Sequence, residues 1–131
     1  MDDNSPLRVV LVDDEPLAIE RLETLCGRID RVEVVGTADH GEAALDVVAR
    51  EAPDLVLLDL TMPGLDGIEV ARRLAKKPSP PAIIFVTAHE SFAVEAFDLD
   101  AVDYVLKPVA AERLERAIAR ALAKRGETAE P

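Results

Sequence analysis

The chain has 131 residues, a length typical of one domain, and its acids outnumber its bases by 26 to 15. The resulting net charge of −11 disfavours binding of this domain to nucleic acid or to an anionic membrane. The lone Cys26 excludes an internal disulfide, no apolar run is long enough to span a bilayer, and the acidic N-terminus is unlike a signal peptide, so we expect a cytoplasmic domain.

Short apolar runs rich in Val, Leu and Ile recur along the chain and predict strands that are buried on both faces. They cover residues 7–12, 32–35, 55–58, 82–86 and 101–106, the last run being interrupted by Asp103.

Apolar residues at helical spacing fill the intervals between these runs and follow the last one. The stripes lie within residues 18–29, 44–48, 68–74, 92–97 and 114–122. Five strands that alternate with five helices predict an α/β fold with a doubly wound, five-stranded parallel sheet in the flavodoxin-like order 2-1-3-4-5. The polar ends, residues 1–6 and 125–131, predict a disordered tail and a linker around a domain of residues 7–124.

Polar residues directly follow four of the predicted strands. Asp13 and Asp14 come after the first strand, Asp59 after the third, Thr87 after the fourth and Lys107 after the fifth. In a doubly wound sheet these strand ends meet at one edge, where three aspartates would repel one another unless a cation neutralised them. Oxygen ligands without His or Cys favour a hard cation such as Mg²⁺, and the hydroxyl and ammonium complete a set suited to phosphoryl chemistry.

Each feature taken alone also has a simpler structural interpretation. The acids before Pro16 suit a helix N-terminus, Asp59 could end a strand, Thr87 could be β-branched filler, and Lys107 could be a surface residue before Pro108. Only their joint occurrence at four strand ends favours a site.

These strand ends carry segments that resemble the receiver domain of two-component response regulators. The segments are VLVDDEP at residues 10–16, LLDLTMPGLDG at 57–67, IFVTA at 84–88 and YVLKP at 104–108. The resemblance runs from residue 7 to residue 124. Residues 96–109 further resemble receivers of the LytTR type (LytR/AlgR-like), whose output is a DNA-binding domain.

The resemblance implies a role for each residue of the site. Asp59 would accept the phosphoryl group, and Mg²⁺ would bind Asp13, Asp14, Asp59 and the backbone carbonyl of Thr61. Lys107 would contact a phosphoryl oxygen, with the Lys107-Pro108 bond in the cis form. Thr87 would follow the phosphoryl group, and Tyr104 would turn inward behind it.

The resemblance also implies partners. A histidine kinase would donate the phosphoryl group, and the surface formed by the fourth helix, fifth strand and fifth helix would pass the change to an output domain, with homodimerisation on activation. DNA would be bound only through that output domain, and the domain itself would not be an enzyme beyond its own phosphorylation and dephosphorylation.

Alternatives from other classes are a stand-alone receiver or metal-free interaction domain and a Mg²⁺-dependent phosphohydrolase. The intact acidic set argues against a metal-free domain. Thr61 stands where such hydrolases commonly carry an acid, which argues against the hydrolase.

Overall fold

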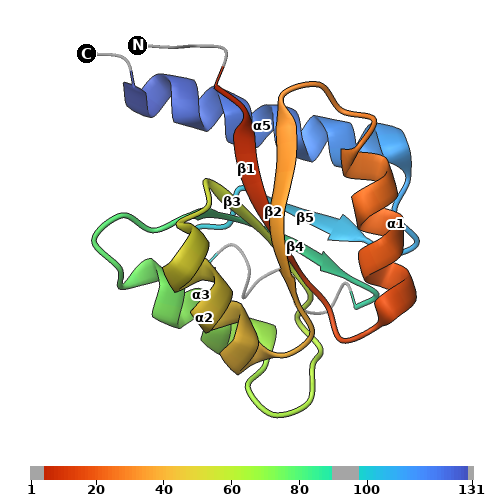
Figure 1. The fold of residues 1–131 in the computed structure, drawn as a ribbon, viewed down its shortest axis with the longest axis vertical. Helices are drawn as coiled ribbons and strands as arrows, with labels where there is room; N and C mark the ends of the chain where they lie inside the picture. The colour runs from red at the N-terminus through yellow and green to blue at the C-terminus, as the bar shows by residue number, and fades with distance from the viewer. Residues whose placement is uncertain (1–4, 90–97, 130–131) are drawn as a thin grey trace.

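The computed structural model describes residues 5–89 and 98–129, in which strands and helices alternate along the chain (Figure 1). The elements are β1 (Leu7–Val12), α1 (Pro16–Cys26), β2 (Val32–Ala38), α2 (Gly41–Glu51), β3 (Leu55–Leu58), α3 (Gly67–Ala75), β4 (Ala82–Thr87), β5 (Asp103–Leu106) and α5 (Ala111–Ala129). All strand pairs are parallel, and the order β2-β1-β3-β4-β5 confirms the predicted topology.

Three strands differ in length from the prediction, and β4 does so only by including Thr87. β2 continues to Ala38, and Val35 is an extra residue in β2 at a register shift opposite Val9 and Val10. β5 begins at Asp103, two residues later than predicted. The helical stripe predicted within residues 92–97 lies outside the described residues.

Side chains of alternate strand residues face opposite sides of the sheet and build two cores. α2 and α3 cover one face, where Val10, Val56 and Phe85 lie. α1 and α5 cover the other face, where Val9 and Ile84 lie (Figure 1). Burial on both faces explains why the strands are continuous apolar runs.

Several helices begin immediately after the loops that follow the strands. Pro16 occupies the first turn of α1, where its missing N–H is not needed. The Nδ1 atom of His40 accepts a hydrogen bond from the backbone N–H of Ala43 (3.2 Å), and Oδ1 of Asp66 accepts one from Glu69 (3.0 Å). These caps fix the first turns of α2 and α3 on the side of the sheet where its strands end.

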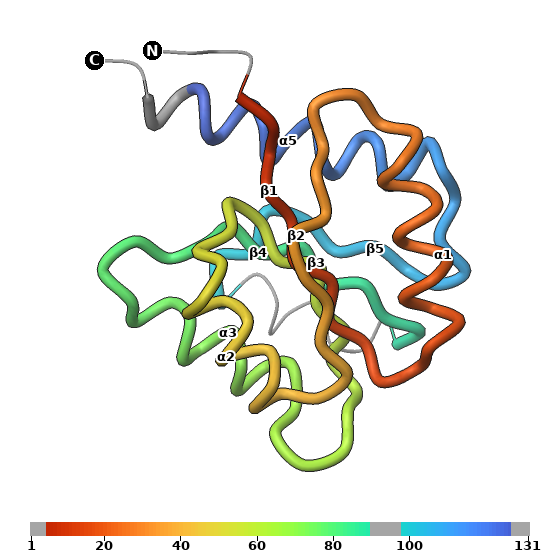
Figure 2. The backbone as a smooth tube through the Cα atoms, in the orientation of Figure 1, coloured from red at the N-terminus to blue at the C-terminus, as the bar shows by residue number. Residues whose placement is uncertain are grey.

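α5 is longer than the sequence predicted, because it continues to Ala129 through residues expected to form a linker. The Arg125 guanidinium donates hydrogen bonds to the carbonyls of Ser5 (3.1 Å) and Pro6 (3.4 Å), and it lies 3.4 Å from Oδ2 of Asp54. The start of β1 and the end of α5 therefore lie side by side (Figure 2). The expected boundary at residue 125 falls inside a helix, while the division into domains stays a prediction. Among the described helices, none has the length and apolar character required to cross a membrane.

Candidate functional site

The carboxyl ends of four neighbouring strands bring the predicted site residues together. Beyond the strands, the N–H of Asp59 donates to the carbonyl of Val12 (3.0 Å) and that of Lys107 to Thr87 (2.8 Å), so the sheet's own hydrogen bonds continue into the site. A cleft of about 250 Å³ opens here. Its lining comprises Asp14, Glu15, Asp59, Thr61, Thr87, Ala88, His89 and Lys107.

Three aspartates form a compact acidic cluster. One carboxylate oxygen from each of Asp13, Asp14 and Asp59 lies within 4.8 Å of the others. Asp13 and Asp59 are buried, at 1% and 4% exposure, whereas Asp14 is exposed. The predicted convergence of these residues is therefore present in the fold.

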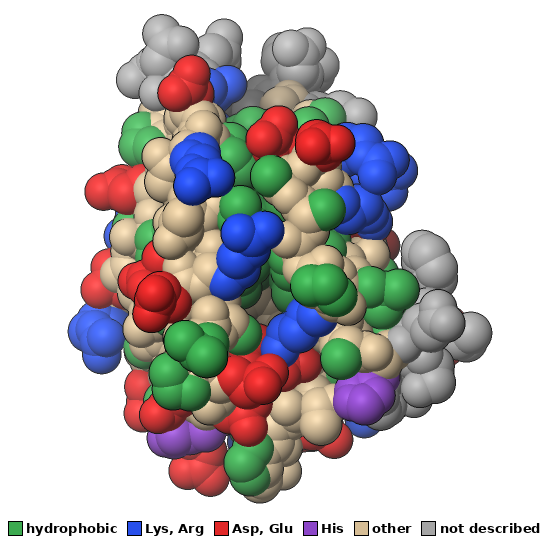
Figure 3. Space-filling view, turned by 90° about the vertical axis from the view of Figure 1, so that its right-hand side faces the viewer, with side chains coloured by type: hydrophobic (Ala, Val, Ile, Leu, Met, Phe, Trp, Pro, Cys, Tyr) green, Lys and Arg blue, Asp and Glu red, His purple; other side chains and the backbone are tan. Residues whose placement is uncertain are grey.

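The Lys107 ammonium lies among these acids. Its Nζ atom is 2.7 Å from Oδ2 of Asp13, 3.0 Å from Oε1 of Glu15 and 3.4 Å from Oδ2 of Asp59. Burial opposes the charged form, but the hydrogen bonds to Asp13 and Glu15 and the charge of Asp59 raise the pKa of Lys107 above its usual value. The surface on this side of the molecule has acidic side chains gathered directly against basic ones (Figure 3). The Lys107-Pro108 peptide bond is cis, as predicted.

Asp13 has an environment suited to a bound cation. Burial, reinforced by the nearby Asp59 carboxylate, raises the pKa of Asp13, against the effects of Lys107 and the Glu15 N–H. Its fully buried Oδ2 faces the Lys107 ammonium at 2.7 Å and accepts no hydrogen bond from any other described residue. A buried carboxylate oxygen with so few partners, in a cluster of oxygen donors, fits Mg²⁺, which Asp13, Asp14 and Asp59 would hold.

Thr61 follows the acidic cluster in the loop after β3. Its backbone N–H donates a hydrogen bond to Oδ1 of Asp59 (3.2 Å), which orients that carboxylate. The use of the Thr61 carbonyl as a metal ligand stays a prediction.

Thr87 and Tyr104 are connected through one intervening residue. Thr87 is completely buried, and its Oγ1 accepts a hydrogen bond from the N–H of His89 (3.4 Å). The Tyr104 hydroxyl donates to the carbonyl of His89. The half-buried ring of Tyr104 packs against the core that α2 and α3 cover. The two residues therefore contact the same segment through hydrogen bonds, and their role as a switch stays a prediction.

The sequence prediction did not assign a site role to Glu15 or His89. Glu15 contacts Lys107 directly, and its signal was its position as the third acid in the run after β1. His89 lines the cleft two residues after Thr87, and no pattern in the sequence distinguishes it from an ordinary loop residue.

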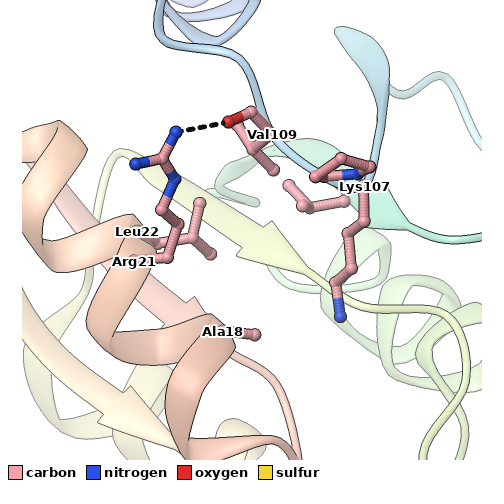
Figure 4. Close-up of a pocket in the computed structure, with 7 residues that line it drawn as sticks. Ala18, Arg21, Leu22, Lys107 and Val109 are labelled. Atoms are coloured by element: carbon pink, nitrogen blue, oxygen red, sulfur yellow. Dashed lines mark hydrogen bonds between the residues drawn. The ribbon is translucent and has the colours of Figure 1, made fainter.

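A second, apolar cavity of about 190 Å³ lies beside Lys107, between α1 and the segment after β5. Arg21 reaches from α1 and donates a hydrogen bond to the Val109 carbonyl (3.0 Å), while the Lys107 side chain extends away from Val109 (Figure 4). Ala18 and Leu22 line the α1 side of this cavity. Arg21 thereby holds the loop that carries Lys107.

Comparison with known proteins gives consistent matches. A family model described as the response regulator receiver domain matches residues 9–119. A positive alginate biosynthesis regulatory protein from Pseudomonas aeruginosa is 51% identical over 116 residues, which cover 88% of this chain and 47% of that protein. The sensory transduction protein LytR of Staphylococcus haemolyticus is 44% identical over 112 residues, covering 86% of this chain and 44% of that protein. The chain thus spans less than half the length of these two relatives.

Solved structures agree with the fold. The response regulatory domain of mrkE from Klebsiella pneumoniae superposes with a TM-score of 0.83 at 35% identity, covering 92% of this chain and 98% of that domain. The isolated REC domain of RcsB from Salmonella enterica serovar Typhimurium, solved with the phosphomimetic BeF3⁻, gives a TM-score of 0.81 at 26% identity. That match covers 88% of this chain and 87% of the RcsB chain.

Proposed function

Because this chain belongs to the response regulator receiver domain family, as a receiver of the LytR/AlgR-like kind, we propose that it is a phosphorylation-controlled switch with Asp59 as the acceptor. Receivers of two-component response regulators are regulatory domains and not enzymes in the usual sense. The observation that carries the proposal is the buried Asp59 carboxylate, whose Oδ2 lies 3.4 Å from the Lys107 ammonium inside the acidic cleft.

The chemistry follows from the residues around Asp59. A carboxylate oxygen of Asp59 attacks the phosphorus of a phosphohistidine on a sensor kinase, the P–N bond breaks with its electron pair left on the imidazole nitrogen, and that nitrogen takes a proton from solvent. Lys107 offers an ammonium to the phosphoryl oxygens, and the Thr87 hydroxyl offers a hydrogen bond. Mg²⁺ held by Asp13, Asp14 and Asp59 would supply further positive charge against those oxygens.

The output of the switch is the surface that includes β5 and α5. Thr87 and Tyr104 link the cleft to this surface through His89. We expect phosphorylation to change the surface and to act on an output domain that binds DNA, with homodimerisation as a further consequence. Support comes from the names of two relatives, the positive alginate biosynthesis regulatory protein of Pseudomonas aeruginosa and the transcriptional regulatory protein LytR of Staphylococcus aureus. Each is more than twice the length of its matched segment.

Beryllofluoride binding tests the proposal. Wild-type protein with Mg²⁺ and beryllofluoride should show amide chemical-shift changes that begin at Asp59 and Thr61 and extend to β5 and α5. Asp59→Asn should show none of them. Equal changes in the Asn variant would mean that another residue is the acceptor.

A further inference from the structure

An ion pair with a buried carboxylate joins the first residue of β5 to the first turn of α5. Arg113 Nη1 donates to Asp103 Oδ2 (2.9 Å) and Nη2 donates to Oδ1 (2.7 Å), which is a two-pronged contact. The Asp103 side chain is only 7% exposed, against 30% for that of Arg113. Burial alone would raise the pKa of Asp103, but the hydrogen bonds from Arg113 and from a backbone N–H hold it below its usual value. The pair is therefore charged and fixed.

The same pair holds the backbone of Tyr104 from both sides. Asp103 Oδ1 accepts a hydrogen bond from the Tyr104 N–H (2.8 Å), and Arg113 Nη2 donates one to the Tyr104 carbonyl (3.0 Å). Both polar groups of one residue are thus bonded to a single carboxylate–guanidinium unit. Rotation of the Tyr104 backbone would require at least one of these charge-assisted bonds to break.

The contacts form a continuous path from the cleft to α5. Thr87 accepts from the His89 N–H, the His89 carbonyl accepts from the Tyr104 hydroxyl, and the Tyr104 backbone is bonded to Asp103 and Arg113. Among the described residues of this path, Thr87 is the only one expected to contact the phosphoryl group. None of them is expected to bind the metal.

We propose that the Asp103–Arg113 pair is a positioning device for Tyr104: it fixes the orientation of the switch tyrosine in the resting state and couples its movement to α5. This inference rests on the proposed function, which makes Tyr104 a moving part. Arg113 is suited to the task because its planar guanidinium binds a carboxylate and a carbonyl at once, which a lysine ammonium does less rigidly.

Arg120 adds a weaker contact to the same carboxylate. Its Nη1 atom lies 3.3 Å from Asp103 Oδ2, and its side chain is 64% exposed. Among the described residues, Arg120 makes no hydrogen bond to Tyr104. It therefore supports the charge of Asp103 without fixing the position of the tyrosine.

The composition supplies a specific probe, since Tyr104 is the only tyrosine in the chain. Protein labelled with 3-fluorotyrosine gives a ¹⁹F spectrum that reports on this residue alone. Spectra are recorded for the resting protein and after addition of Mg²⁺ and beryllofluoride. The test variant is Arg113→Ala. Arg113→Lys keeps the positive charge and is included in case Arg113→Ala fails to fold. The control is Arg116→Ala, which changes an exposed arginine of α5.

The resting Arg113→Ala protein should show a shifted or split Tyr104 resonance, and Arg113→Lys a smaller change in the same direction. Arg116→Ala should match wild type. Amide signals of Asp59 and Lys107, and beryllofluoride binding itself, should be retained, whereas the response of α5 amides to beryllofluoride should be reduced in both Arg113 variants. A merely structural role would lower the melting temperature without moving the Tyr104 signal.

Superimposable ¹⁹F spectra of wild type, Arg113→Ala and Arg113→Lys in both conditions would overturn the inference. A wild type that fails to respond to beryllofluoride would count against the proposed function instead, and the resting spectra would still decide whether the pair positions Tyr104.

Discussion

Lys107 and the acids around it form the charged centre of the site. The ammonium lies within 3.4 Å of Asp13, Glu15 and Asp59, so one positive charge faces three carboxylates. Burial is the largest cause of the raised pKa of Asp13, and repulsion from the nearby Asp59 carboxylate adds to it. The cleft therefore retains an excess of negative charge that a divalent cation can neutralise.

Replacement of Lys107 by Met should increase the affinity for Mg²⁺. The ammonium and a metal compete for Oδ2 of Asp13, and removal of one ion pair corresponds to about 1 kcal/mol, or roughly fivefold in affinity. Titration calorimetry with MgCl₂ measures the effect, and Lys76→Met, a change at an exposed lysine of the same sequence, should leave the affinity unchanged. Weaker binding by the Lys107 variant would show that the lysine supports metal binding.

Asp103→Asn should destabilise the fold by about 2 kcal/mol near pH 7, because it weakens charge-assisted hydrogen bonds to Arg113. The pKa of Asp103 is lowered in the folded state, so the folded protein binds its proton less readily than the unfolded chain does. The stabilising contribution is therefore complete above the unfolded pKa of about 3.9 and is lost as the pH falls through the folded value.

Urea unfolding between pH 7 and pH 3 measures that dependence. The stability difference between wild type and Asp103→Asn should stay constant down to about pH 4 and then shrink. Asp30→Asn, at an exposed acid, should show no difference at any pH. A wild-type advantage that grows below pH 4 would contradict the assignment of the ion pair.

At the scale of the elements, periodicity and strand-end chemistry predicted most of the structure. Continuous apolar runs predict the strands here because the sheet is covered on both faces. The parallel order of the strands brings the polar residues at their carboxyl ends together, independently of the loop conformations. Asp103 shows where such reasoning fails. Its charge interrupted an apolar run, and only the fold reveals that Arg113, ten residues later, neutralises it.

The ends of the chain were predicted less well, because residues there can form a helix without the apolar periodicity on which the prediction depended. Residues 125–129 carry no apolar stripe, yet they belong to α5, which Arg125 fastens to the start of β1 and to Asp54. Long-range contacts of single side chains, such as those of Arg125 or of Glu15 with Lys107, leave no periodic signal in a sequence.

Gly67 allows the loop after β3 to pack against α3. A Cβ atom at this position would lie 2.2 Å from the carbonyl oxygen of Asp59 and 2.7 Å from Cα of Leu60, both of which are backbone atoms. Gly67→Ala should therefore destabilise the protein by about 2–3 kcal/mol and displace Asp59. Thermal unfolding gives the stability, and the loss of the Mg²⁺-induced rise in melting temperature reports the displacement.

Gly126→Ala provides the matched control, because a Cβ at this glycine in α5 would meet no atom within 4 Å. It should be neutral or should stabilise the helix by up to about 1 kcal/mol. Equal losses in both glycine variants would mean that close packing at Gly67 is not the cause.

At the scale of the whole molecule, charge is distributed unevenly along the chain. Residues 1–65 contain 15 of the 26 acids and only 5 of the 15 bases, and this half supplies Asp13, Asp14 and Asp59. The second half supplies Lys107 and the Asp103–Arg113 pair. Folding thus brings an acidic half, which would hold metal and accept a phosphoryl group, against a nearly neutral half that would respond.

The proposed switch requires that Asp59 is the residue that becomes phosphorylated. The most direct measurement is intact-protein mass spectrometry after incubation with a small phosphoryl donor, with and without Mg²⁺, for wild type, Asp59→Asn and Asp46→Asn as an exposed-acid control. We expect a mass increase of one phosphoryl group in wild type and Asp46→Asn, only with Mg²⁺, and none in Asp59→Asn. The same mass increase in Asp59→Asn would show that another residue is phosphorylated.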